Sequence, residues 1–228
     1  MPEPLDRPVW ASLAGLHAGL ALGGTLAKRY LPEVNRFASA CDDSDAALAA
    51  LAALVQPGEP VFVLQVPAIR IPSSLVASKL ALGVQMVAAA PIAAEDGPDT
   101  VVPLGDADAQ EMLALATLTQ PGPFLRQTHR MGRFVGIRIG GELAAMAGER
   151  FRFPGYTEVS GVCTHPDFRG RGLARRLSRH VAAGIAARGD TAFLHAWKSN
   201  TAAIRLYETL GFRLRCEVNV AVLDAMPG

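Results

Sequence analysis

The chain has 228 residues, enough for one large domain or two small ones with a sizeable core. Half of the residues are hydrophobic and 19% are charged, which predicts a folded protein rather than a disordered one. The formal net charge of +1 gives no reason to expect a nucleic acid or a membrane surface as partner. Three widely spaced cysteines, without a C-x-x-C pair, predict reduced thiols in the cytoplasm and no structural metal: Cys41, Cys163 and Cys216.

The first apolar stretch, residues 9–27, carries no formal charge. Gly15, Gly19 and Gly23 have the spacing of small residues in paired membrane helices. However, the glycines dilute the apolarity, and no basic segment of the kind that begins a signal peptide precedes the stretch. We therefore expect a soluble helix with one buried face, ending near residues 23–24, and no membrane span.

The rest of the first half alternates helix and strand. Residues 42–58 predict a helix that begins with acidic residues and stops at Pro-Gly, and residues 60–66 and 83–90 predict buried strands. Residues 91–99 contain two prolines and a glycine between apolar segments. This break predicts an N-terminal α/β domain without a recognisable motif, residues 1–94, and a second domain, residues 95–228.

The second half predicts a sheet with interspersed helices. A glycine pair at residues 140–141 predicts a hairpin between two of its strands. The predicted strands are residues 100–104, 133–139, 142–151, 156–164, 191–197 and 212–223. The predicted helices are residues 106–119, the segment from the glycines near 170 to about 188, and residues 200–211.

The stretch HPDFRGRGLARRL, residues 165–177, places two glycines and several arginines between a strand and a helix. The first amides of a helix have no intrahelical acceptor, and the helix dipole is positive there. Glycines at 170 and 172 let these amides approach a ligand without an intervening Cβ atom, which suits a pyrophosphate. The stretch matches neither a Walker A loop nor the dinucleotide motif G-x-G-x-x-G. Taken alone it could also be a solvated loop or a basic RNA-binding turn.

A second motif follows Arg169 by 31 residues: NTAAIRLYETLGF, residues 200–212. The two motifs, in this order and with a helix and a strand between them, resemble those of the GCN5-related N-acetyltransferases (GNAT). The first fits the Q/R-x-x-G-x-G/A pattern of that family, and the second fits N-x-x-A-x-x-x-Y-x-x-x-G-F. The resemblance covers residues 99–223 and is strongest to the FR47-like branch.

The resemblance implies an α/β (α+β) fold with a mixed, mostly antiparallel central sheet flanked by helices. Residues 1–94 could be a degenerate copy of this fold, an interpretation that rests on the alternation of helices and strands alone. The family binds acetyl-CoA between two splayed strands, here 156–164 and 191–197, with a bulge for which Gly161 is the best candidate. The implied contacts are the amides of the glycine turn, the backbone of the first strand and one asparagine: Val162, Cys163, Thr164, Arg169, Gly170, Arg171, Gly172, Leu173, Ala174 and Asn200.

The implied chemistry is direct attack of a primary amine on the thioester in a ternary complex. Tyr207 matches the proton donor to the departing thiolate, although it could be a packed core residue. Glu158 resembles the glutamate that some members use as general base, and burial could raise its pKa toward neutrality. A structural carboxylate at 158, a base at His129 and water remain alternatives. No histidine pairs with Cys163 in the sequence pattern, so an acyl-cysteine intermediate is not expected.

Three further residues have no assigned chemistry at this point. His165 precedes a proline at a turn, which indicates a structural role. His195 and Trp197 share a face of their strand, where they belong either to the core or to the acceptor pocket.

We therefore expect a cytoplasmic N-acetyltransferase with acetyl-CoA and an unidentified amine as partners, without a metal, and with a homodimer left open. A non-catalytic acyl-CoA-binding sensor and a transferase of longer acyl groups are the alternatives.

Overall fold

A computed structural model describes residues 3–226, which form a central eight-stranded sheet beside a three-stranded one. All neighbouring strands of the large sheet are antiparallel except β9 and β10, which are parallel. The spatial order is β4 (Val61–Gln65), β11 (Phe212–Ala225), β5 (Leu75–Ala88), β10 (Thr191–Trp197), β9 (Tyr156–Thr164), β8 (Glu142–Phe153), β7 (Phe134–Ile139) and β6 (Val101–Leu104). The mixed, mostly antiparallel fold class predicted from the sequence is confirmed.

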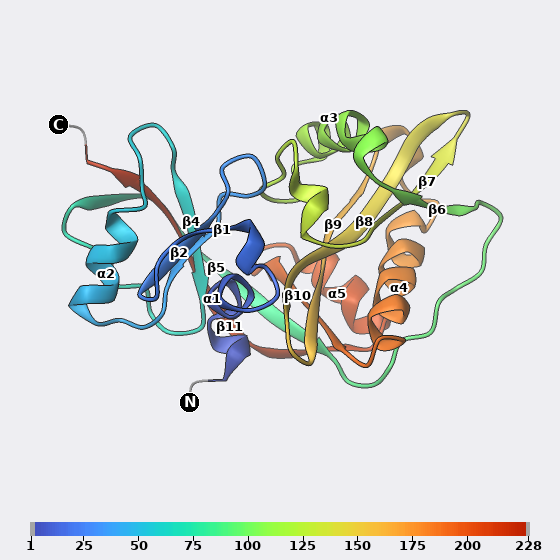
Figure 1. The fold of residues 1–228 in the computed structure, drawn as a ribbon. Coiled ribbons are helices and arrows are strands. Elements are labelled where there is room, and N and C mark those ends of the chain that lie inside the picture. Colours follow the sequence, from blue (N-terminus) through green and yellow to red (C-terminus); the bar gives the residue numbers. More distant parts are fainter. Residues whose placement is uncertain (1–2, 227–228) are drawn as a thin grey trace.

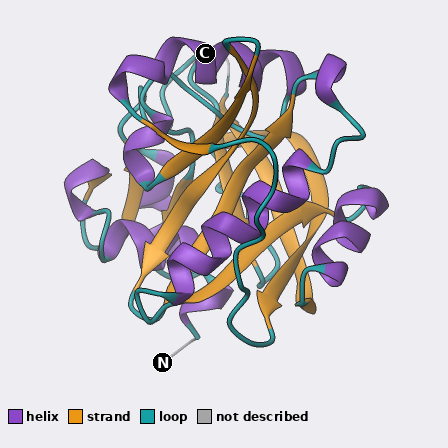
Figure 2. Ribbon diagram, turned by 90° about the vertical axis from the view of Figure 1, so that its right-hand side faces the viewer, coloured by secondary structure: helices purple, strands orange, loops and turns teal. Residues whose placement is uncertain are grey.

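Helices α4 (Leu173–Ala186) and α5 (Thr201–Thr209) cover one face of this sheet. Every fourth residue of α4 from Leu173 to Ile185 is buried and apolar, and arginines stand between these positions. One side of the helix therefore packs on the strands. Figure 2, seen from the α4 side, shows the twisted strands running behind this helix.

N-terminal elements cover the opposite face. They are α1 (Pro8–Ala14) and the small sheet of β1 (Ala21–Gly23), β2 (Ala27–Tyr30) and β3 (Ala38–Ala40). Helix α2 (Asp45–Ala52) packs near β2 and β3, and α3 (Ala109–Thr119) packs on β8 and β9. In Figure 1 the blue and cyan N-terminal elements lie on the left, the yellow and orange elements on the right, and β5 and β11 pass between them.

The helix predicted from residue 9 to near residues 23–24 is wrong, because α1 ends at Ala14 and strand β1 begins at Ala21. Gly15 leaves the helical conformation, and the Nδ1 atom of His17 then lies 2.9 Å from both the Ser12 and the Tyr30 hydroxyl oxygens. These polar contacts stabilise a turn after α1, and a continued helix would separate His17 from Tyr30. No helix within residues 3–226 is long and apolar enough to cross a membrane.

Strand β5 joins the two halves of the chain into one sheet. It belongs to the N-terminal half, yet it lies between β10 and β11 of the C-terminal half. Gly83 of β5 pairs with Trp197 on one side and with Val218 on the other. The predicted boundary near residue 94 falls in a connection, 89–100, that contains no helix or strand. The division into two domains, and the idea of a degenerate copy, stay predictions.

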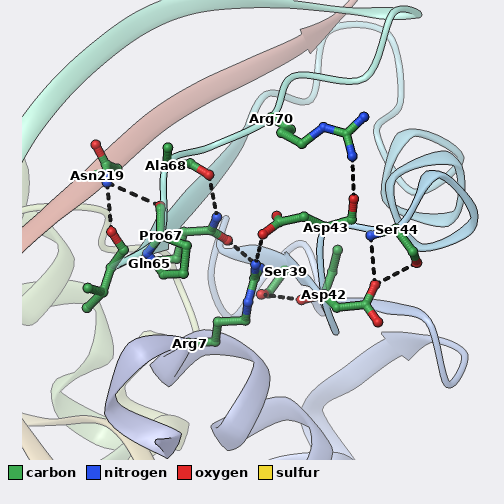
Figure 3. Close-up of polar contacts among 12 residues, drawn as sticks. Arg7, Ser39, Asp42, Asp43, Ser44, Gln65, Pro67, Ala68, Arg70 and Asn219 are labelled. Atoms are coloured by element: carbon green, nitrogen blue, oxygen red, sulfur yellow. Dashed lines mark hydrogen bonds and ion pairs between the residues drawn. The ribbon is translucent and has the colours of Figure 1, made fainter. Parts of the chain in front are cut away.

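A polar cluster fixes the end of β4 against α1 and α2 (Figure 3). The guanidinium of Arg7 donates to Gln65 Oε1 at 2.6 Å and to the Asp43 carboxylate at 2.5 Å. Arg70 donates to the backbone carbonyl of Asp43, and Asn219 of β11 donates to two carbonyl oxygens just after β4. Because Arg7 is buried and charged, these contacts hold β4 in a defined position relative to the N-terminal helix.

Candidate active site

Strands β9 and β10 pair only at their beginnings and then separate. The paired residues are 156–158 of β9 and 191–193 of β10. Beyond them a cavity of about 780 Å³ is lined by residues 159–164 on one side and 195–197 on the other. The cavity also reaches residues from both faces of the sheet, so it passes through the opening between the two strands. The predicted splayed pair is therefore confirmed.

Strand β9 contains the predicted bulge at this opening. Two residues of β9, Gly161 and Val162, lie opposite one residue of β8. Gly161 has a φ of +63°, and a Cβ atom there would lie 2.9 Å from the Phe134 ring. Glycine is thus required both by the backbone conformation and by the packing. The bulge interrupts the regular ladder between β8 and β9 beside the cavity.

The glycine turn before α4 forms the second wall. Gly170 and Gly172 have φ values of +80° and +73°, a conformation that other residues rarely adopt. Within residues 3–226, the amides of Gly170, Arg171 and Gly172 donate no backbone hydrogen bond, and open space surrounds both glycines. Arg169 and Arg171 have no carboxylate partner among the same residues, whereas Arg175 is paired with Glu95 at 3.0 Å. Free amides, a helix start and two arginines without a carboxylate partner are the features that suit a segment to bind an anion.

Helix α5 places two predicted residues on the cavity wall. Asn200 caps the helix, because its side-chain oxygen accepts from the Ala203 amide at 3.1 Å. The ring of Tyr207 packs edge-on against Phe212, with ring centroids 6.0 Å apart, and lines the cavity. Burial, with a smaller contribution from the charge of Glu158, raises the pKa of Tyr207 to about 12. The phenol is therefore protonated at neutral pH and able to donate a proton.

Every cofactor-binding residue predicted from the sequence lines this one cavity. The set is Val162, Cys163, Thr164, Arg169, Gly170, Arg171, Gly172, Leu173, Ala174 and Asn200. Glu158, in contrast, is not among the lining residues.

Glu158 is fully buried behind the cavity wall, where its carboxylate is held by a charged neighbour. Arg150 of β8 donates to its two oxygens, from Nε at 2.7 Å and from Nη2 at 2.6 Å. Burial alone would raise the pKa of Glu158, but Arg150 and His195 outweigh it and lower that pKa to about 2. The expected rise toward neutrality is therefore wrong, because the sequence does not show that an arginine eight residues earlier pairs with this carboxylate.

His195 of β10 connects this ion pair to the N-terminal half. Its Nδ1 atom lies 2.7 Å from Glu158 Oε1, and its Nε2 atom lies 3.0 Å from Gln85 Nε2. Arg215 donates to Gln85 Oε1, so the amide nitrogen of Gln85 faces the imidazole and donates to it. Nδ1 then carries the proton and donates to Glu158. Burial lowers the pKa of His195, although the Glu158 charge opposes this, and the ring is neutral at pH 7.

The side chains of the remaining sequence candidates lie outside the cavity or are buried in the core. His129 is outside the cavity wall and contacts Asp106 at 2.7 Å. The Cys163 side chain is buried in the core beside α3, and burial raises the pKa of its thiol to about 11, so it is not a thiolate. His165 accepts from the Asp167 amide and caps the turn before the glycines. No group of three potential metal ligands occurs within residues 3–226.

Most residues at the far end of the cavity were not predicted from the sequence. The exceptions are His195 and Trp197, which were expected either in the core or in an acceptor pocket. Its walls come from segments that carry no motif, and they include Phe37, Phe62, Leu64, Gly83, Arg150, Val218 and Val220. Apolar residues in ordinary strands have the same pattern whether they face a core or a cavity, so nothing in the sequence marks them.

Comparisons with known proteins agree with this geometry. The model of the family described as FR47-like protein matches residues 134–221. The N-alpha-acetyltransferase RimI of Mycobacterium tuberculosis is 33% identical over 131 residues, which is 53% of this chain and 82% of that protein. A mycothiol acetyltransferase of Thermobispora bispora is 46% identical over 56 residues, 24% of this chain and 19% of that protein.

Solved structures extend the similarity to the whole chain. A protein of Novosphingobium aromaticivorans, assigned to the acetyltransferases of the GNAT family, has a TM-score of 0.92 and 44% identity, and the match covers 99% of this chain and 100% of that one. A GCN5-related N-acetyltransferase of Kribbella flavida shares the fold at 19% identity, with a TM-score of 0.65 and a match over 100% of this chain and 98% of that one.

A cavity between two splayed strands, with an anion-binding turn at one wall, defines an acyl-CoA-dependent acyltransferase. The chain belongs to the GCN5-related N-acetyltransferase family.

Proposed function

We propose that this protein transfers an acetyl group from acetyl-CoA to a primary amine by direct attack in a ternary complex. One observation carries the proposal: a single cavity runs from the glycine turn, through the opening between β9 and β10, to a separate end on the opposite face of the sheet. Two substrates can therefore meet inside it without a covalent enzyme intermediate. The protonated thiol of Cys163 also argues against such an intermediate.

The glycine turn suits the pyrophosphate of acetyl-CoA. The amides of residues 170–174 and the charges of Arg169 and Arg171 would hold it at the start of α4. The backbone of residues 162–164 would run beside the pantetheine arm, with Asn200 on the other wall. A backbone amide at the bulge near Gly161 would then lie close to the thioester carbonyl and polarise it.

The proton steps follow from which groups face the cavity. The amine nitrogen bonds to the carbonyl carbon, the carbon–sulfur bond breaks, and the departing thiolate takes the proton of Tyr207. The amine also has to lose a proton. Neither Glu158 nor His129 lines the cavity, and both nitrogens of His195 are engaged. We therefore propose that this proton leaves through water, and that Glu158 positions Arg150 and His195.

The test is a thiol-release assay with acetyl-CoA, propionyl-CoA and longer acyl-CoA over a library of primary amines. Acetylation of at least one amine, with the acetyl donor preferred, is the expected result. Binding of CoA without turnover of any amine would instead favour a non-catalytic sensor. A preference for longer donors would favour a transferase of other acyl groups.

A further inference from the structure

The end of the cavity farthest from the glycine turn has an apolar and aromatic wall. It is built by residues that alternate toward one face of adjacent strands, together with one residue before β3: Phe37, Phe62, Leu64, Trp197, Val218 and Val220. Val220 pairs with Leu64, and Gly83 lies between Trp197 and Val218. A Cβ atom at Gly83 would lie 3.0 Å from a Val218 methyl group, so glycine lets the Val218 side chain pack closely into the wall.

One charged side chain, Arg150, lines this end of the cavity. Arg150 lines the cavity, whereas the carboxylate that pairs with it does not. The Arg150 Nη1 atom has no hydrogen-bond partner among residues 3–226 and is not fully buried. Lys79, which is not among the lining residues, places its ammonium 4.7 Å from the centroid of the Trp197 ring. No aspartate or glutamate occurs among the described residues that line the cavity.

We infer that the acceptor is a free α-amino acid with a bulky apolar side chain. This inference rests on the proposed acetyltransferase function and assigns its second substrate. The side chain would occupy the wall of Phe62, Leu64 and Trp197, and the carboxylate would accept hydrogen bonds from Arg150 Nη1. A guanidinium fits a carboxylate well, and a pocket without acidic residues disfavours polyamines and lysine-like side chains.

The experiment compares acceptors on the wild-type protein. We expect kcat/KM for L-phenylalanine and L-leucine to exceed that for 2-phenylethylamine, which lacks the carboxylate, by about tenfold or more. L-phenylalaninamide is expected between them, and spermidine and L-lysine below all three. A preference for spermidine or L-lysine, or equal rates for L-phenylalanine and 2-phenylethylamine, would overturn the inference but leave the acetyltransferase proposal intact. A peptide beginning with phenylalanine that outperforms the free amino acid would also overturn it.

A pair of variants tests the wall. Phe62→Ala should raise KM for L-phenylalanine about tenfold or more while KM for acetyl-CoA stays within about twofold. Leu80→Ala is the matched control, because Leu80 is 66% exposed on β5 and outside the cavity. Equal KM values for Phe62→Ala and the control would overturn the inference.

Calorimetry separates the inference from the proposed function. Binding of L-phenylalanine to the protein–CoA complex without turnover of any amine would support the acceptor site and contradict the acetyltransferase proposal. If L-phenylalanine does not bind and no amine is turned over, both the acceptor inference and the acetyltransferase proposal are overturned.

Discussion

Replacement of Glu158 by glutamine tests whether this residue is a structural anion or a base. The carboxylate is 0% exposed and accepts two hydrogen bonds from Arg150, whose side chain is only 12% exposed. Glu158→Gln keeps the shape but removes the charge, which leaves a nearly buried guanidinium without its counter-ion. Removal of one partner of a buried pair costs about 3–5 kcal/mol. That is a large share of a typical unfolding free energy of about 5–15 kcal/mol.

Urea unfolding at pH 7 measures this cost. With an m-value of about 3 kcal/mol/M, the midpoint should fall by roughly 1–1.7 M while m stays constant. Glu142→Gln is the matched control, since Glu142 is an exposed carboxylate of β8, and it should change stability by no more than about 0.5 kcal/mol. The double variant Arg150→Met with Glu158→Gln should recover much of the loss, because it removes both charges together.

Kinetics of the same variant distinguish the two roles. If Glu158 is structural, turnover per folded molecule should stay within about tenfold and the acidic limb of the pH profile should persist. A loss of less than about 1 kcal/mol, together with lower turnover and a missing acidic limb, would refute the structural assignment and restore Glu158 as the base.

Three further predictions concern the proton donor, the anion site and pH. Tyr207→Phe should lower turnover by about 10²–10⁴-fold and leave the affinity for acetyl-CoA unchanged. We expect a value nearer the lower limit, because a thiolate leaves readily. If the variant has wild-type turnover in the thiol-release assay, Tyr207 is not the acid. CoA at a hundred times its Kd should stabilise the protein by about 2.7 kcal/mol, which is measured as a rise in Tm. Gly172→Asp should abolish this rise. Gly189→Asp is the control and should keep the rise, because Gly189 also has a positive φ but lies outside the cavity. Burial lowers the pKa of His17 to about 4, so the unfolded chain binds the proton more tightly and stability should fall as pH drops from 6.5 toward 4. His17→Gln should flatten that slope in urea titrations between pH 4.5 and 7, and an unchanged slope would assign it to other groups.

The parts of the site that are encoded locally could be predicted. Glycines at 170 and 172 and the following helix specify the turn within a few residues, because a positive φ and free amides are properties of the segment itself. Gly161 marks the bulge for the same reason. Tyr207 and Asn200 follow from the resemblance of residues 200–212 to the second motif of the family.

The parts that depend on distant partners could not be predicted. The pKa of Glu158 is set by Arg150, and the tautomer of His195 is set by Gln85 from the other half of the chain. The sequence pattern alone also overestimated the length of the helix after residue 9. The contact between His17 and Tyr30 favours a turn there instead. In each case the deciding interaction lies in the tertiary structure.

The position of β5 between β10 and β11 limits how this protein can diversify by recombination. The N-terminal segment supplies both a central strand and, through Phe62 and Leu64 of β4, part of the far wall of the cavity. Exchange of this segment for that of a relative would have to match two neighbouring strands in register before it could alter selectivity. Gradual substitution of single wall residues is therefore the easier evolutionary route to a new acceptor.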